Sequence, residues 1–254
     1  MTNLNCYSNR PAAGMDECLS EETGKYPVAE TAKLIERKWT ILILRELLGG
    51  KKRFNEILKS LKGISPKVLS TRLIELGENG IINRDAYLEV PMRVEYSLTE
   101  KGQDLKDPIA GLAEWWVEWE YMLLEFTNNE EITNLQGCYP GCPITGEEKC
   151  LLEETGKCPV VETAKLIEKK WTIPILRELL NGKRRFNEVL NSLEGISPRV
   201  LSDRLREMGE SGIINRKAYA EIPLRVEYAL TEKGQDLENA IASMAEWWME
   251  WNGE

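Results

Sequence analysis

Apolar residues recur with a helical period along the first part of the chain. From Pro27 to Ile35 they return every three or four residues, and a proline is well tolerated in a first helical turn. The segments Trp39–Leu48 and Phe54–Leu61 have similar apolar faces, and glycine follows each of them. The pattern therefore predicts three short helices in succession.

A fourth helix and a hairpin follow these three. Ser65 and Pro66 combine an N-cap residue with a first-turn proline, which predicts a helix that runs to Gly80. The period then shortens, and Ile81–Tyr87 and Arg93–Thr99 are typical of a β-hairpin. Two helices joined by a short glycine-containing turn, with a hairpin behind them, form a winged helix. A small helical bundle with an added hairpin is the alternative.

The whole pattern occurs twice. The segment from Trp39 to Trp119 recurs from Trp171 to Trp251 at a constant offset of 132 residues, and about 77 of 107 aligned residues are identical. Each copy is close to the size of one domain. We predict a mainly α fold with small β-hairpins, in which two tandem winged helix-turn-helix domains form a pseudo-dimer.

The expected organisation has four segments. Residues 1–25 form a cysteine-bearing N-terminal segment, 26–127 the first winged-helix domain, 128–157 a cysteine-containing linker and 158–254 the second domain. A linker of this length can extend to roughly 100 Å. It therefore permits intramolecular pairing of the two copies or exchange between two chains in a homodimer.

The last helix of each copy carries three tryptophans. They share one broad face of the helix and offer more aromatic area than a small winged helix needs internally. We expect them to pack copy against copy, and closure of each domain's own core is the alternative. The residues are Trp115, Trp116 and Trp119, and their counterparts Trp247, Trp248 and Trp251.

Helical geometry divides the fourth helix of each copy into two faces. Its core face holds Leu69, Leu73 and Leu76, or Leu201, Leu205 and Met208 in the second copy. The outward face, which would enter a DNA major groove, holds Lys67, Ser70, Thr71 and Ile74, or Arg199, Ser202, Asp203 and Arg206. Because three of the four outward positions differ, we expect the copies to read different half-sites. Asp203 could accept a hydrogen bond from cytosine, but pairing with its neighbouring arginines is the simpler explanation.

The charge of the chain is unevenly distributed. The net charge of −9 taken alone argues against a nucleic-acid partner. However, Lys51–Arg72 has a net charge of +6 and Lys183–Arg206 has +3, so the first copy should contribute more electrostatic affinity. Further arginines lie on the hairpins, where they would meet phosphates or the minor groove. The predicted DNA-binding residues are Lys67, Ser70, Thr71, Arg72, Arg84, Arg93, Arg199, Ser202, Asp203, Arg206, Arg216 and Arg225.

Other classes of protein find little support. The chain has no histidine, no phosphate-binding glycine motif and no apolar run of 18 residues, and its first residues do not look like a secretion signal. We therefore expect no enzyme activity, no membrane partner and a cytoplasmic location.

Several motifs of the second copy resemble a known family, the HxlR-type winged-helix transcriptional regulators. They are Cys158–Glu162, Lys170–Ile173, Leu176–Leu179, Arg185–Glu188, Ile196–Leu201 and Arg225–Gly234. The resemblance implies a bacterial or archaeal regulator that works as a homodimer on a pseudo-palindromic operator. It also implies a dimer interface made by the terminal helices and, in several members, sensing of oxidants or electrophiles by the cysteine before the first helix. That cysteine is Cys158 here, whereas the first copy has Tyr26.

Four cysteines cluster before and at the start of the second domain. They are Cys138, Cys142, Cys150 and Cys158. Without histidine, this set could hold an all-cysteine zinc site or an iron–sulfur cluster. It could also serve thiol–disulfide sensing, or stay reduced. Cys158 precedes Pro159 at a helix start, where the helix dipole favours a thiolate, so it is the expected redox sensor.

These observations predict a sequence-specific regulator of transcription that binds double-stranded DNA. We expect it to respond to redox state or metal through the cysteines of the second copy. One chain would supply both half-site readers, about one DNA turn apart. The alternative is a winged-helix protein-interaction module that carries a cysteine-ligated metal or iron–sulfur redox centre. Salt-dependent affinity for duplex DNA separates the two.

Overall fold

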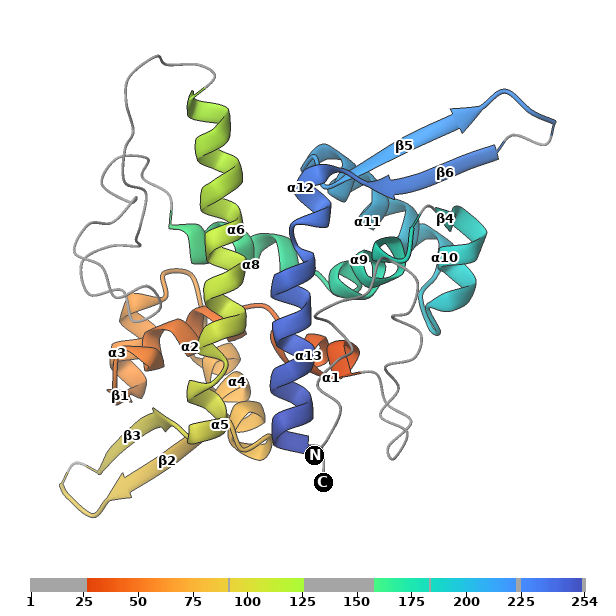
Figure 1. Cartoon of the computed structure of the whole chain (residues 1–254). Helices are drawn as coiled ribbons and strands as arrows, with labels where there is room; N and C mark the ends of the chain where they lie inside the picture. Colours follow the sequence, from red (N-terminus) through yellow and green to blue (C-terminus); the bar gives the residue numbers. More distant parts are fainter. Residues whose placement is uncertain (1–26, 91, 126–157, 183, 223–224, 253–254) are drawn as a thin grey trace, which may run out of the picture. The chain divides into compact units, whose positions relative to one another are not determined.

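A computed structural model describes residues 27–90, 92–125, 158–182, 184–222 and 225–252 (Figure 1). The first copy runs from helices into a hairpin and ends in a long helix, as the sequence predicts. Its elements are α1 (Pro27–Ile35), α2 (Thr40–Leu48), β1 (Lys52–Arg53), α3 (Phe54–Ser60), α4 (Pro66–Glu78), β2 (Ile82–Tyr87), β3 (Arg93–Leu98), α5 (Glu100–Gln103) and α6 (Lys106–Glu125).

The second copy repeats this order. Its elements are α8 (Pro159–Ile167), α9 (Thr172–Leu180), β4 (Arg184–Arg185), α10 (Phe186–Ser192), α11 (Pro198–Glu210), β5 (Ile214–Tyr219), β6 (Arg225–Leu230), α12 (Glu232–Gln235) and α13 (Glu238–Asn252). The short strands β1 and β4 and the single-turn helices α5 and α12 were not predicted, because they are too brief to show a period.

Each copy contains one antiparallel three-stranded sheet. The strand orders are β1-β3-β2 and β4-β6-β5, so the predicted hairpin gains a short strand that precedes the third helix. Arg84 lies opposite Tyr96 in the first sheet, and Arg216 lies opposite Tyr228 in the second. The fold is mainly helical with two winged helix-turn-helix units, which confirms the predicted fold class.

The predicted core faces of the fourth helices are buried. Leu69, Leu73 and Leu76 are each at most 3% exposed on α4, as are Leu201, Leu205 and Met208 on α11. Burial of three large apolar side chains contributes roughly 1.5–3 kcal/mol each. This anchoring fixes which face of each helix remains available to a ligand.

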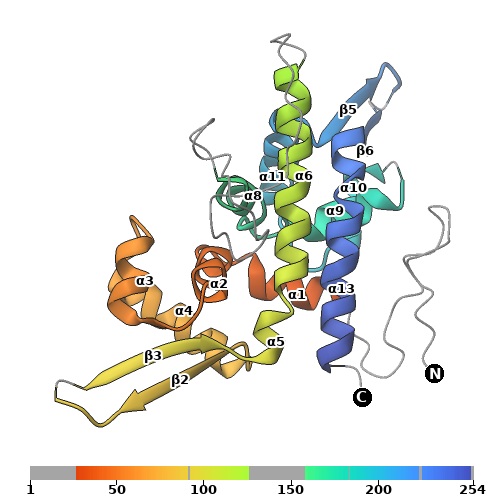
Figure 2. The ribbon, with the colours of Figure 1, turned by 60° about the vertical axis from the view of Figure 1, so that its left-hand side comes forward.

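The compact units do not coincide with the repeats. One unit comprises Arg37–Glu168, and the other combines Met1–Glu36 with Lys169–Glu254. Helix α1 packs on α9 and α13 of the second copy, and α8 packs on α2 and α6 of the first (Figure 2). The expected ranges 26–127 and 158–254 follow the repeats, whereas the units arise because each copy gives its first helix to the body of the other.

Buried threonines tie the exchanged helices in place. The hydroxyl of Thr31 on α1 donates to the backbone carbonyl of Met244 on α13 (2.8 Å). That of Thr163 on α8 is shared between the carbonyls of Pro159 in its own helix (2.7 Å) and Leu112 on α6 (3.1 Å). Both side chains are almost completely buried, so their hydrogen bonds are protected from water. The two copies therefore contact each other through α1 with α13 and α8 with α6, as expected for intramolecular pairing.

The tryptophans lie on the helices that receive the exchanged helix. Trp115 on α6 is 5% exposed, and Trp247 and Trp248 on α13 are 5% and 9% exposed. They are buried in units that contain helices of both copies. No helix in the described part of the chain is long and apolar enough to span a bilayer.

Candidate nucleic-acid interface

The sequence around each fourth helix fixes where it begins. The hydroxyl of Ser65 accepts a hydrogen bond from the backbone N–H of Val68 (3.3 Å), and Pro66 occupies the first turn. Ser197 does the same for Val200 (3.3 Å) on α11. These caps satisfy helix N–H groups that would otherwise lack an acceptor.

The outward positions of both helices lie where the sequence places them. Lys67, Ser70, Thr71 and Ile74 are exposed on α4, and Arg199, Ser202 and Arg206 are exposed on α11. Asp203 is partly exposed and pairs with Arg206 (3.6 Å), in agreement with the intrahelical pairing suggested by their spacing. Each helix therefore exposes a face of net positive charge, and the face of α4 also includes the apolar Ile74. Such a face suits a major groove.

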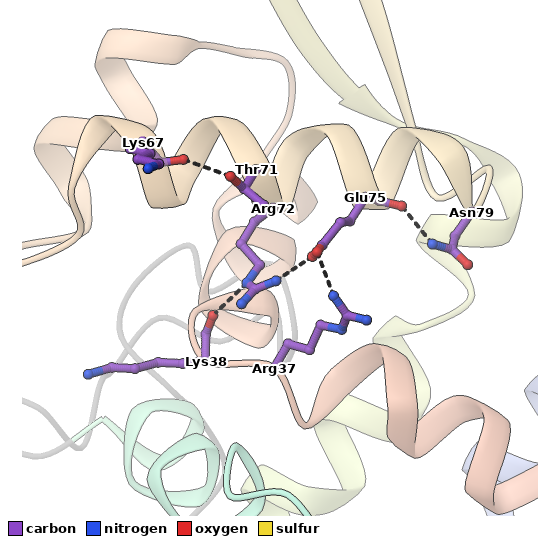
Figure 3. Close-up of polar contacts among 7 residues, drawn as sticks. All are labelled: Arg37, Lys38, Lys67, Thr71, Arg72, Glu75 and Asn79. Atoms are coloured by element: carbon purple, nitrogen blue, oxygen red, sulfur yellow. Dashed lines mark hydrogen bonds and ion pairs between the residues drawn. The ribbon is translucent and has the colours of Figure 1, made fainter.

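Arg72, one of the residues predicted to bind DNA, makes two contacts within the first copy. Its Nε donates to the backbone carbonyl of Lys38 (3.2 Å), and its guanidinium also pairs with Glu75 (Figure 3). Glu75 in turn pairs with Arg37 (2.5 Å). Arg72 thus fastens α4 to the turn before α2.

The second copy has an equivalent anchor. Glu207 pairs with Arg204 (2.5 Å) and with Lys169 (2.9 Å). The hydrogen bond from Lys169 and the nearby arginines hold the pKa of Glu207 below its ordinary value. Both recognition helices are therefore tied to the residues that follow the exchanged helix.

Trp39 has an unusual backbone at this turn. Its φ is 79°, a left-handed conformation rare outside glycine, and Trp171 matches it with 81°. A side chain added at Gly63, in the turn before α4, would meet the indole of Trp39 at 3.7 Å. The indole of Trp39, at the start of α2, therefore lies beside the turn that precedes α4.

A glutamate of the opposite copy accepts a hydrogen bond from the backbone of Trp39. The N–H of Trp39 donates to Glu168 (2.9 Å), which directly follows the exchanged helix α8. Reciprocally, Trp171 and Ile173 donate to Glu36 at 3.4 and 3.3 Å. Burial raises the pKa of Glu36 to about 7 against the effect of these hydrogen bonds, and burial also raises the pKa of Glu168.

The predicted wing arginines fall into two groups. Arg84 and Arg216 are exposed and form no ion pair with any other residue that the structure describes. Arg93 lies over the ring of Tyr87 (4.2 Å) and pairs with Glu89 (3.1 Å). Arg225 makes the matching contacts with Tyr219 (4.0 Å) and Glu221 (2.9 Å). The first pair is available to a phosphate backbone, whereas the second pair makes contacts within its own hairpin.

Cys158 is the N-cap residue of α8, as the sequence predicts, but it lies in the body of the first copy. Its Sγ is 3.6 Å from Nη1 of Arg45 on α2, and the cysteine is 6% exposed. Arg45 also donates to Glu46 (2.7 Å), and Glu46 accepts from Lys52 on β1 (2.5 Å). A continuous polar chain thus leads from Cys158 to the sheet of the first wing.

Glu46 is the central carboxylate of this chain. Burial would raise its pKa, but hydrogen bonds from Lys52 and Arg45 bring the pKa below its ordinary value. The carboxylate therefore stays ionised between its two cationic partners. The other cysteines proposed for a metal site, Cys138, Cys142 and Cys150, lie outside the described residues.

Sequence reasoning missed the residues that link each exchanged helix to the start of α2 or α9. Glu36, Glu168 and Trp39 belong to no recognised motif, and their partners are more than 100 positions away. One signal was present. The helix predicted from Trp39 has no Ser, Thr, Asp or Asn before it, so its first N–H groups needed an acceptor from elsewhere.

Comparison with known proteins decides what these paired winged helices are. A model of the HxlR-like helix-turn-helix matches residues 34–122 and again residues 166–254, together well over half of the chain. The chain belongs to the HxlR-like helix-turn-helix family. This confirms the resemblance seen in the sequence, and the family is one of transcriptional regulators.

HxlR-like relatives align with about one copy. The HTH-type transcriptional regulator sll1512 of Synechocystis is 42% identical over 108 residues, which are 42% of this chain and 78% of the relative. YvaP of Bacillus subtilis, another HTH-type regulator, is 38% identical over 101 residues, 39% of this chain and 94% of the relative. A solved structure of the redox regulator HypR is 39% identical, covers 38% of this chain and 99% of its own, and gives a TM-score of 0.36.

Proposed function

We propose that this HxlR-like chain binds double-stranded DNA sequence-specifically, with α4 and α11 as the two recognition helices. The observation that carries the proposal is the exposed cationic face of each helix, anchored from behind by a buried apolar stripe. Arg84 and Arg216 on the wings add exposed positive charge that suits phosphates. Local positive charge thus overcomes the acidic net charge of the chain.

Alanine variants of the outward face test this proposal. Lys67→Ala removes a cation that suits a phosphate, so the log–log salt slope of duplex binding should fall by about one. Arg199→Ala removes a candidate base contact and should lower specific affinity about tenfold. Fluorescence anisotropy with a selected duplex measures both.

The matched control is Lys106→Ala, which changes an exposed lysine at the start of α6, outside the helix-turn-helix. It should leave both quantities unchanged. If the wild-type chain has no affinity for duplex DNA at low salt, or a log–log salt slope near zero, DNA binding is rejected and the protein-interaction module is favoured.

We further propose that oxidation of Cys158 regulates this binding through the first copy. A thiol that is 6% exposed cannot gain an oxygen atom without displacing its neighbours, and Arg45 is one of them. Displacement of Arg45 disturbs Glu46 and Lys52, which hold β1 of the first wing. Cys158, which belongs to the second copy, would therefore act on DNA binding by the first copy.

Peroxide titration of DNA binding tests this regulation. Wild-type affinity should change several-fold on oxidation, and Cys158→Ser should abolish the change. Cys18→Ser is the control for general thiol damage, and Arg45→Lys can be compared with Arg177→Lys in the other unit. A Cys158→Ser variant that still responds would remove this residue from the sensing model. Iron and zinc analysis of anaerobically purified protein tests the metal alternative for the four cysteines.

A further inference from the structure

The two recognition helices share one scaffold and differ in what they expose. Both are 13 residues long, begin with proline after a serine cap and bury three apolar side chains. Their outward positions can therefore be compared one to one. Ser70 and Ser202 match, whereas the other three positions carry Lys67, Thr71 and Ile74 on α4 but Arg199, Asp203 and Arg206 on α11.

This difference leaves the net charge of the two faces the same. The α4 face has one positive residue, and the α11 face has two positive residues and one negative residue. Attraction to phosphates depends on net positive charge, so these four positions should add about equally to the attraction of each helix for DNA. The divergence therefore changes the chemistry that is offered to base edges.

The α4 face offers apolar groups. Ile74 is 58% exposed, and its counterpart on α11 is arginine, so the scaffold does not require an apolar side chain there. Thr71 donates its hydroxyl hydrogen to the carbonyl of Lys67 within the helix (3.0 Å), which leaves its methyl group for an apolar contact. In the major groove, apolar side chains contact the methyl group of thymine.

The α11 face offers guanidinium groups. Arg199 is exposed and forms no ion pair with any other residue in the described part of the chain. Asp203 lies 3.6 Å from Arg206, and because both side chains are about half exposed or more, water weakens the pair. An arginine presented to the major groove pairs with guanine through O6 and N7.

We propose that this chain recognises a non-palindromic operator. The half-site contacted by α4 carries thymine at the position of Ile74, and the half-site contacted by α11 carries guanine at the position of Arg199. This inference rests on the proposed function, because it names the DNA sequence that the same two helices read.

Selection from a library of random duplexes by the full-length chain tests the inference. The enriched motif should have two unlike halves. Palindromic duplexes that carry two copies of either half should bind about tenfold more weakly than the enriched motif, since one good base contact provides about this discrimination. An enriched motif that is a perfect palindrome would overturn the inference while leaving DNA binding intact.

Reciprocal variants link the asymmetry to these residues. Lys67→Arg, Thr71→Asp and Ile74→Arg together give α4 the outward face of α11, and the selected motif should become a palindrome of the guanine-containing half. The reverse triple, Arg199→Lys, Asp203→Thr and Arg206→Ile, should select a palindrome of the other half. Unchanged motifs in both folded variants would contradict the inference. Absence of any enriched motif or salt-dependent binding would defeat the proposed function together with it.

Discussion

Gly102 shows how closely single residues are fitted in this fold. A Cβ added to it would lie 2.1 Å from the carbonyl oxygen of Ile81, and Gly234 meets Ile213 at 2.2 Å in the second copy. Beside it, Thr99 caps α5 by accepting from the N–H of Gly102 (3.1 Å) and donates to Gly80 (2.7 Å). The base of the wing is therefore closed by a backbone contact that admits no side chain.

We expect Gly102→Ala to destabilise the protein by about 1–3 kcal/mol or more, because the opposing atom belongs to the backbone. Gly77→Ala is the matched control. Gly77 lies in α4, and a Cβ added there would meet nothing within 4 Å, so alanine should stabilise the helix by up to about 1 kcal/mol. Urea unfolding of both variants measures the difference, and equal stabilities would refute the steric argument.

The sequence predicted residue roles well where the environment is local. The core and outward positions of α4 and α11 follow from helical periodicity, and the structure confirms their burial and exposure. The roles of Arg72 and Arg93 could not be predicted in the same way. Their partners, Lys38 and Tyr87, meet them only after the chain has folded.

At the scale of elements, α9 is capped by a carboxylate that its own copy does not supply. Glu36 accepts from Trp171 and Ile173, and burial raises its pKa to about 7. Between the ordinary pKa of 4.5 and this raised value, the unfolded chain loses the proton before the folded chain does. The stability that the folded chain gains by holding this proton more tightly is therefore complete below about pH 4.5, and it is lost as the pH rises through 7.

Glu36→Gln should remove this part of the pH dependence, because glutamine keeps an acceptor oxygen and cannot ionise. We expect the wild-type melting temperature to drop more than that of the variant between pH 5 and pH 8. Glu168→Gln is a useful companion, since the pKa of Glu168 is also raised by burial. Parallel melting curves for wild type and Glu36→Gln across this range would contradict the assignment.

The order and bounds of the main elements were largely accessible from the sequence. Serine caps, first-turn prolines and glycine-terminated apolar runs marked the helices to within a few residues. What these signals could not reveal is which copy each helix joins. The apolar faces of α1 and α8 would be equally well buried against either copy, because the two copies are so similar.

At the scale of the whole molecule, exchange of the first helices should hold the two copies together without the linker. Cleavage at a protease site inserted between residues 128 and 157 tests this expectation. We expect the fragments to stay together on gel filtration, because α1 with α13 and α6 with α8 still bury apolar surface. The uncut chain under the same conditions is the control, and separation of the fragments in native buffer would contradict this expectation.

The exchange also has an evolutionary consequence. A substitution in α1 changes its fit to α13 of the other copy, so we expect each copy's first helix to coevolve with the other copy. Loss of one copy by recombination would remove part of both bodies at once. The exposed faces of α4 and α11 do not take part in the exchange, so they remain free to diverge.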